Sequence, residues 1–170
     1  MSETLEPALP DHLDGQAERL MRRVRDAGLT IATAESCTGG MLAALLTDIE
    51  GAGRGFDRGF VTYTKEAKAE LLGIEQNLLD RNDAVSEVVA RAMAEGALGR
   101  SHADVALAVT GFAGPGGPGQ EEGLVHFALA RRDRPTLHRE EHFGSIGRGA
   151  IRVNSLKAML ELLEQSLDRG

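Results

Sequence analysis

The sequence predicts an α/β fold, a single-domain three-layer α/β/α sandwich with a mixed sheet. A chain of 170 residues, 42% of them apolar, is large enough for one domain with a sizeable core. Helical and strand patterns alternate through the first part of the chain, which favours parallel strands covered by helices. Two later strand patterns, at residues 124–130 and 137–143, are joined near Asp133 and Pro135 and predict an adjacent pair of strands.

The remaining elements follow from the spacing of apolar residues. Helices are predicted where apolar residues recur every three or four positions, at about residues 13–27, 38–50, 66–72, 86–93 and 147–167. Short apolar runs predict strands at residues 29–34, 60–64 and 103–109, and residues 110–122 are predicted to form a Gly/Pro loop.

The first residues differ in composition from the rest of the chain. Residues 1–14 are acidic, contain Pro7 and Pro10, and lack the basic start and apolar centre of an export signal. We therefore expect residues 1–13 to form a mobile acidic tail and residues 14–170 to form the domain.

Composition excludes several classes of protein. A net charge of −7 argues against nucleic-acid binding, which needs Lys and Arg against phosphates. Cys37 is the only cysteine, so no internal disulfide can form, and this suits a reducing cytoplasm. No apolar run reaches the length of a membrane span. We expect a cytoplasmic protein with no membrane partner.

A serine follows the first buried strand, in the run Ala-Glu-Ser-Cys-Thr-Gly-Gly at residues 34–40. Ligands bind at strand ends in open α/β sheets, and the first N–H groups of a helix attract anions. This predicts Ser36 as a nucleophile, with Thr38, Gly39 and Gly40 beside a phosphate or an oxyanion. The alternative is that Ser36 or Thr38 only caps the helix, and the motif alone favours neither the nucleophile nor the cap. Cys37 is a rival nucleophile, although a lone cysteine is more often a small apolar filler.

A serine nucleophile needs a base, and the segment at residues 60–68 offers lysines. Tyr63 is predicted at a strand end, while Lys65 and Lys68 lie in a first helical turn, where cations are disfavoured. A buried lysine with a lowered pKa is a credible general base. The alternative is two solvated lysines.

Two further segments suggest binding residues. The run Thr-Gly-Phe-Ala-Gly-Pro at residues 110–115 ends the most apolar strand and again places a hydroxyl and small residues at a strand end, which is a weak signal alone. Arg148 and Arg152 are predicted at the head of the apolar stripe of the last helix, where charge is unexpected. A bound phosphate or carboxylate would explain them, and a salt bridge to an acidic residue such as Glu35 would do so equally well.

With these residues in view, the sequence resembles the C-terminal domain family of CinA proteins. Members of this family are also called competence/damage-inducible proteins, and the stand-alone, PncC-like members are nicotinamide-nucleotide amidohydrolases. The resemblance covers about residues 14–167, and it rests on residues 34–40, 59–68, 84–86 and 110–115 together.

The resemblance implies a hydrolase of pyridine-nucleotide salvage that converts nicotinamide mononucleotide to nicotinate mononucleotide and ammonia. It implies Ser36 as nucleophile, Lys68 with Tyr63 as activating pair, no metal or other cofactor, and a homo-oligomer. The expected substrate-binding residues are Thr38, Gly39, Gly40, Thr110, Gly111, Ala113, Gly114, Arg148 and Arg152.

The chain departs from the family pattern at three places. Lys65 stands where the family usually has Asn, the loop at residues 116–122 looks shortened, and Gly147 replaces the usual Asp before the last helix. These departures motivate an alternative function, a catalytically weak nucleotide-binding or regulatory module with the same fold.

Overall fold

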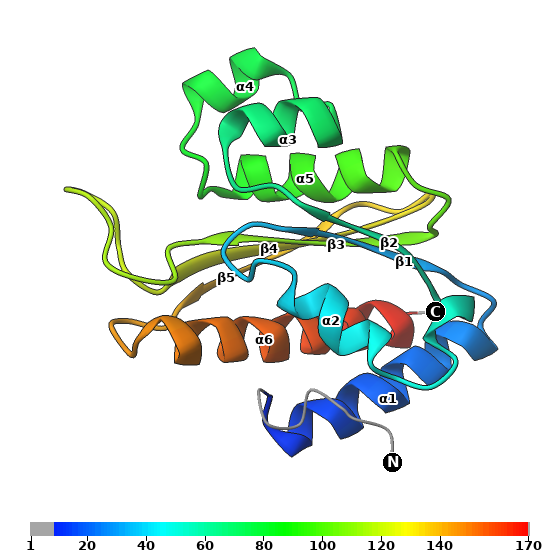
Figure 1. Ribbon diagram of the computed structural model, residues 1–170. Coiled ribbons are helices and arrows are strands. Elements are labelled where there is room, and N and C mark those ends of the chain that lie inside the picture. The colour runs from blue at the N-terminus through cyan, green and yellow to red at the C-terminus, as the bar shows by residue number, and fades with distance from the viewer. Residues whose placement is uncertain (1–8, 170) are drawn as a thin grey trace.

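A five-stranded mixed sheet forms the middle layer of the protein in a computed structural model, which describes residues 9–169 (Figure 1). The strands lie in the order β2-β1-β3-β4-β5. β1 pairs in parallel with β2 and β3, whereas β4 is antiparallel to both β3 and β5. The bounds are β1 Ile31–Glu35, β2 Phe56–Val61, β3 Val105–Gly111, β4 Leu124–Arg131 and β5 Leu137–His142.

Helices cover both faces of this sheet (Figure 1). One layer contains α1 (Asp11–Asp26), α2 (Met41–Thr47) and α6 (Arg148–Asp168). The opposite layer contains α3 (Lys65–Leu72), α4 (Gln76–Arg81) and α5 (Glu87–Gly99), and a 3-10 turn at Ala52–Arg54 precedes β2. The predicted three-layer α/β/α sandwich with a mixed sheet is therefore confirmed.

The burial of each strand explains its sequence pattern. Every residue of the interior strand β1 is buried, which suits its largely apolar run. The edge strands β2 and β5 have partly exposed residues throughout, so they contain charged residues. Aliphatic side chains fill one core cluster on each face of the sheet, with Phe127 as the only fully buried aromatic residue among residues 9–169.

Parts of the fold differ from the sequence prediction. The strand predicted at residues 60–64 is β2, which spans Phe56–Val61, and residues 62–64 lead into α3. Its start was missed because Asp57 and Arg58 are partly exposed charged residues that interrupt the apolar pattern. α4 was not predicted, since its six residues are too few to show a helical period. The predicted tail over residues 1–13 is also too long, because α1 begins at Asp11 and both Leu9 and Leu13 are buried in the core. The predicted mobility of residues 1–8 lies outside the described residues.

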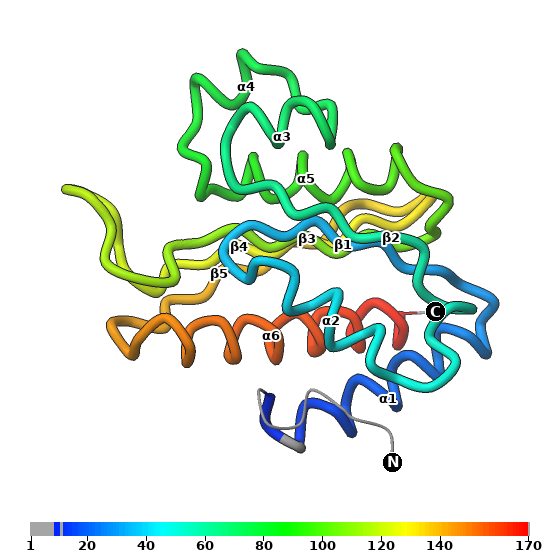
Figure 2. The backbone as a smooth tube through the Cα atoms, in the orientation of Figure 1, coloured from blue at the N-terminus to red at the C-terminus, as the bar shows by residue number. Residues whose placement is uncertain are grey.

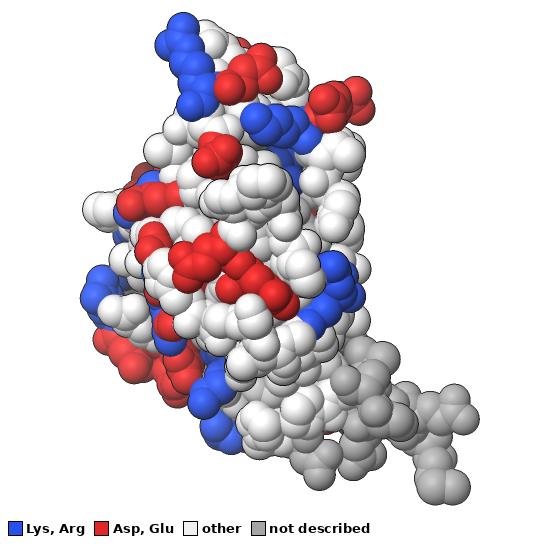
Figure 3. All heavy atoms as spheres, turned by 90° about the vertical axis from the view of Figure 1, so that its left-hand side faces the viewer, with Lys and Arg blue, Asp and Glu red and all other residues white. Residues whose placement is uncertain are grey.

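The topology brings three chain segments to one edge of the sheet. The carboxyl ends of the parallel strands β2, β1 and β3 lie together, so residues 62–64, Ser36 and the loop after Gly111 become neighbours. This loop, residues 112–123, projects from the body of the molecule beyond the sheet (Figure 2). Acidic side chains gather across the middle of this end of the molecule, with basic side chains toward its margins (Figure 3).

Candidate active site

Ser36 is the first residue after β1, and the sheet itself fixes its backbone. Its N–H donates to the carbonyl of Val109 in β3 at 3.1 Å, and its carbonyl accepts from the Gly39 N–H at 3.1 Å. The chain then reverses through Gly39 and Gly40, whose φ angles of 60° and 97° are in the left-handed region that favours glycine. Ser36 is only 8% exposed, so the residue is nearly buried at the carboxyl end of β1.

Lys68 reaches Ser36 from α3, which lies in the helix layer opposite α2. Its side chain is fully buried, and Nζ lies 3.3 Å from Ser36 Oγ. Nζ also donates to the carbonyls of Thr62 at 2.9 Å and Tyr63 at 3.4 Å, which hold the amine in place. Burial lowers the pKa of Lys68 from 10.5 to about 8, because the charged ammonium loses its hydration. A lysine that releases its proton near neutral pH and contacts a serine hydroxyl is suited to act as a base.

The structure separates the two lysines that the sequence left open. Lys65 Nζ donates to the carbonyls of Leu79 at 2.5 Å and Asn82 at 3.3 Å, so it joins α3 to the segment around α4. Lys68 alone contacts Ser36. The Tyr63 side chain is 70% exposed, and only its backbone carbonyl bonds to Lys68.

Cys37 is a poor rival to Ser36. Its side chain is buried, and burial raises the pKa of the thiol to about 12. A cysteine attacks as the thiolate, which this environment disfavours at neutral pH. Cys37 therefore resembles a small apolar filler more than a nucleophile.

Glu35 has a role that the sequence prediction missed. Its fully buried carboxylate accepts hydrogen bonds from the Thr38 hydroxyl at 2.6 Å and the Gly40 N–H at 3.1 Å. It also accepts from the N–H groups of Leu42 at 3.0 Å and Ala43 at 2.8 Å. The start of α2 thus already has an anion. A Glu at the end of a largely apolar strand was the available signal, since a buried carboxylate needs several donors.

This arrangement changes the expectation for Thr38, Gly39 and Gly40. The Thr38 hydroxyl and the Gly40 N–H bond to Glu35, and the Gly39 N–H bonds to Ser36. These groups support the Ser36 loop in this structure and are not presented to a ligand. Glu35 is also not the acidic partner that was considered for Arg148 and Arg152, because its carboxylate bonds to residues 38–43 instead.

Arg148 and Arg152 flank the site from the start of α6. Arg152 is half-buried, and its Nε donates to the Cys37 carbonyl at 2.8 Å. Arg148 is exposed, and its Nη2 lies 2.5 Å from the position that a Cβ atom would occupy on Gly114. The sequence prediction placed both arginines in the core-facing stripe. The first buried residue of α6 is instead Ile151, and the residues before it in the helix are exposed.

The residues at the end of β3 divide into two groups. Thr110 is buried and donates to the Ala84 carbonyl at 2.9 Å, and a Cβ on Gly111 would lie 2.7 Å from Val125 Cγ2. Both residues, with the buried Ala113, serve packing in this structure. Gly114 differs because it permits the close approach of Arg148.

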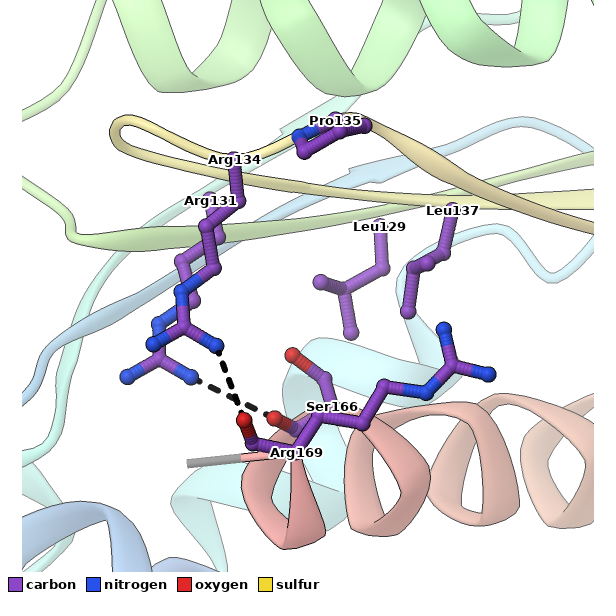
Figure 4. A pocket seen from close by; sticks show the side chains of 7 residues that line it. All are labelled: Leu129, Arg131, Arg134, Pro135, Leu137, Ser166 and Arg169. Carbon is purple, nitrogen blue, oxygen red and sulfur yellow. Dashed lines mark hydrogen bonds between the residues drawn. The ribbon is translucent and has the colours of Figure 1, made fainter.

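A separate cavity of about 260 Å³ lies under the turn between β4 and β5 and beside the end of α6 (Figure 4). Arg131 donates to the Ser166 carbonyl at 3.3 Å, and Arg134 donates to the Arg169 carbonyl at 3.4 Å. Cations are favourable at a helix C-terminus, which accounts for these two arginines. None of the predicted site residues lines this cavity.

No helix within residues 9–169 has both the length and the apolar character to cross a bilayer. The same residues also contain no group of three or more His, Cys, Asp or Glu side chains placed to hold a metal ion.

Comparison with known proteins decides the family. The model of the CinA C-terminal domain matches residues 14–167. This chain belongs to the CinA C-terminal domain family. Among curated relatives of this CinA-domain protein, the nicotinamide-nucleotide amidohydrolase PncC of Escherichia coli is 41% identical over 151 residues, which cover 88% of this chain and 91% of the relative.

Other relatives are longer proteins. A CinA-like protein of Mycolicibacterium gilvum is 46% identical over 146 residues, which cover 85% of this chain and 34% of the relative. The chain thus spans about a third of the length of several curated relatives that it matches.

Solved structures of the family share the fold. The competence/damage inducible protein CihA of Agrobacterium tumefaciens has a TM-score of 0.89 and 44% identity, covering 94% of this chain and 98% of that one. A CinA superfamily protein of Escherichia coli has a TM-score of 0.85 and 36% identity, covering 92% of each chain.

Proposed function

We propose that this CinA-domain protein is an amidohydrolase that deamidates nicotinamide mononucleotide. The observation that carries the proposal is the 3.3 Å contact between Lys68 Nζ and Ser36 Oγ in a buried setting. The similarity to the PncC amidohydrolase of Escherichia coli supports the reaction class and suggests this substrate.

In the proposed reaction, neutral Lys68 takes the proton of Ser36 as Oγ attacks the carboxamide carbon. The resulting tetrahedral intermediate collapses when the C–N bond breaks, and protonated Lys68 returns the proton to the nitrogen so that ammonia leaves. Water then attacks the Ser36 ester with Lys68 as base, and nicotinate mononucleotide departs while Ser36 regains its proton. The backbone N–H groups of Gly111, Ala113 and Gly114 are our candidates for the oxyanion donors, because those of Gly39, Gly40 and Phe112 already donate within the chain.

The nucleotide phosphate is assigned to the two arginines of α6. Arg148 lies against Gly114 and Arg152 against the Ser36 loop, so an anion between them would contact both segments of the site. Two guanidinium groups also supply the local positive charge that a phosphate needs on a chain with net charge −7. Tyr63 is proposed to join the activating pair only after its exposed side chain turns toward Ser36.

The alternative is a regulatory module that binds a nucleotide at this site without efficient turnover. The exposure of the Tyr63 side chain favours it, because the second member of the activating pair does not contact the reacting atoms. In either case we propose a cytoplasmic homo-oligomer in pyridine-nucleotide salvage, and light scattering of the purified protein measures its oligomeric state.

Ammonia release from nicotinamide mononucleotide, with mass spectrometry of the product, tests the proposal. The amidohydrolase gives stoichiometric ammonia and nicotinate mononucleotide, and the Ser36→Ala variant gives neither. Calorimetric binding of the mononucleotide without ammonia would support the regulatory module and overturn the enzyme proposal.

A further inference from the structure

Glu35 and its hydrogen-bond partners enclose the loop that carries Ser36. The residue is attached covalently to Ser36 on one side, and its carboxylate bonds to Thr38, Gly40, Leu42 and Ala43 on the other. The four bonds, at 2.6 to 3.1 Å, therefore connect the end of β1 to the first turn of α2 across the loop. Removing them would free the α2 end of the segment that presents the serine, while the bond from the Ser36 N–H to Val109 would still hold its β1 end.

These contacts differ from an ordinary helix cap. A capping side chain normally belongs to the N-cap residue itself, but the N-cap of α2 is Gly40, which has no side chain and a φ of 97°. Glu35 reaches the same N–H groups from five or more residues earlier. A cap placed at residue 40 would stabilise α2 equally well, whereas only a cap from Glu35 also fixes the loop between them.

We propose that Glu35 is the positioning residue of the site, and that its buried carboxylate holds Ser36 Oγ within reach of Lys68 Nζ. Ser36 is the first residue of the loop after β1 and Lys68 lies on α3, so their 3.3 Å contact depends on the path of this loop. A displacement of about 1 Å at a reacting atom lowers a rate by about a hundredfold. Glu35 touches neither the substrate nor the reacting atoms, so it acts through Ser36.

This inference rests on the proposed serine chemistry but not on nicotinamide mononucleotide as the substrate. The experiment therefore measures acetylation of Ser36 by p-nitrophenyl acetate, followed by mass spectrometry of the peptide that contains Ser36. The full chain is compared with the Glu35→Gln variant, whose amide cannot accept the same set of N–H donors. Circular dichroism and a melting curve establish that each variant is folded at the assay temperature.

Asp104 supplies a matched control at the opposite end of β1. Its carboxylate accepts from the N–H and the hydroxyl of Thr30, both at 2.9 Å, and it lies far from the reacting atoms along the strand. Asp104→Asn should lower the melting temperature and leave the Ser36 acetylation rate unchanged. A general loss of stability would affect both variants alike.

We expect Glu35→Gln to slow Ser36 acetylation by about a hundredfold, with the pH midpoint near 8 unchanged because burial of Lys68 sets it. Thr38→Val, which removes only the 2.6 Å bond, should slow it less, and Thr38→Ser should restore it. These two variants decide the question if Glu35→Gln does not fold.

Three results would overturn the inference. They are a wild-type acetylation rate in folded Glu35→Gln or in Thr38→Val, a shifted pH midpoint, and absence of acetylation at Ser36 in the unaltered chain. Acetylation of Ser36 without ammonia release from the mononucleotide would reject the proposed substrate. The acetylation rates of the variants would still test the role of Glu35.

Discussion

Raising the pH through 8 should activate this protein and also begin to stabilise it, both through Lys68. The pKa of Lys68 falls from 10.5 in the unfolded chain to about 8 in the folded one, a difference of about 2.5 units. At about 1.36 kcal/mol per unit, the folded state bears about 3 kcal/mol for burying the protonated amine. Lys68 has no exposed surface in the folded chain, so about 3 kcal/mol is the upper limit of this cost.

The sign of the stability effect follows from proton binding. Between about pH 8 and 10.5 the unfolded chain keeps the proton on Lys68 while the folded chain has lost it, so stability rises with pH. Below about pH 8 both states are protonated and the full cost is present. Replacing Lys68 with Met removes the titrating group and should remove this rise.

Two measurements follow. Urea denaturation of the unaltered protein and of Lys68→Met at several pH values should show a difference that changes by about 3 kcal/mol over this window. The rate of ammonia release should fall about tenfold per pH unit below 8, because only the neutral amine accepts a proton. Lys65→Ala should retain this profile. Parallel stability curves, or a flat rate from pH 6 to 9, would refute Lys68 as a buried neutral base.

The remaining predictions concern the serine, the arginines and metal. Ser36→Ala should lower kcat by about 10⁶ in the ammonia assay while Cys37→Ala changes it little, and the opposite order would make Cys37 the nucleophile. Arg148→Ala and Arg152→Ala should each raise KM for the mononucleotide by about tenfold, from one charge-assisted hydrogen bond, and leave any hydrolysis of free nicotinamide nearly unchanged. Equal losses on both substrates would make these arginines structural. A chelator should not affect turnover, and inhibition reversed by added divalent metal would contradict the serine mechanism.

Local sequence patterns identified most elements of the fold. The largely apolar runs of β1 and β3 are typical of strands buried on both faces, and the helix predicted at residues 86–93 lies within α5 and its cap, where Ser86 accepts from the Val89 N–H. Patterns were weakest where burial is partial. β2 lies at an edge and mixes Asp57 and Arg58 with apolar residues, and α4 is too short for a period.

Local spacing alone predicted the α/β class, the location of Ser36 at a strand end, and two lysines as candidates for the base. The contact that distinguishes Lys68 from Lys65 appears only in the packed structure, since it joins residues 32 positions apart. The packed structure also placed the carboxylate of Glu35, where sequence alone predicted a bound anion. Both results depend on which donors and acceptors meet once the layers pack, and linear spacing does not contain that information.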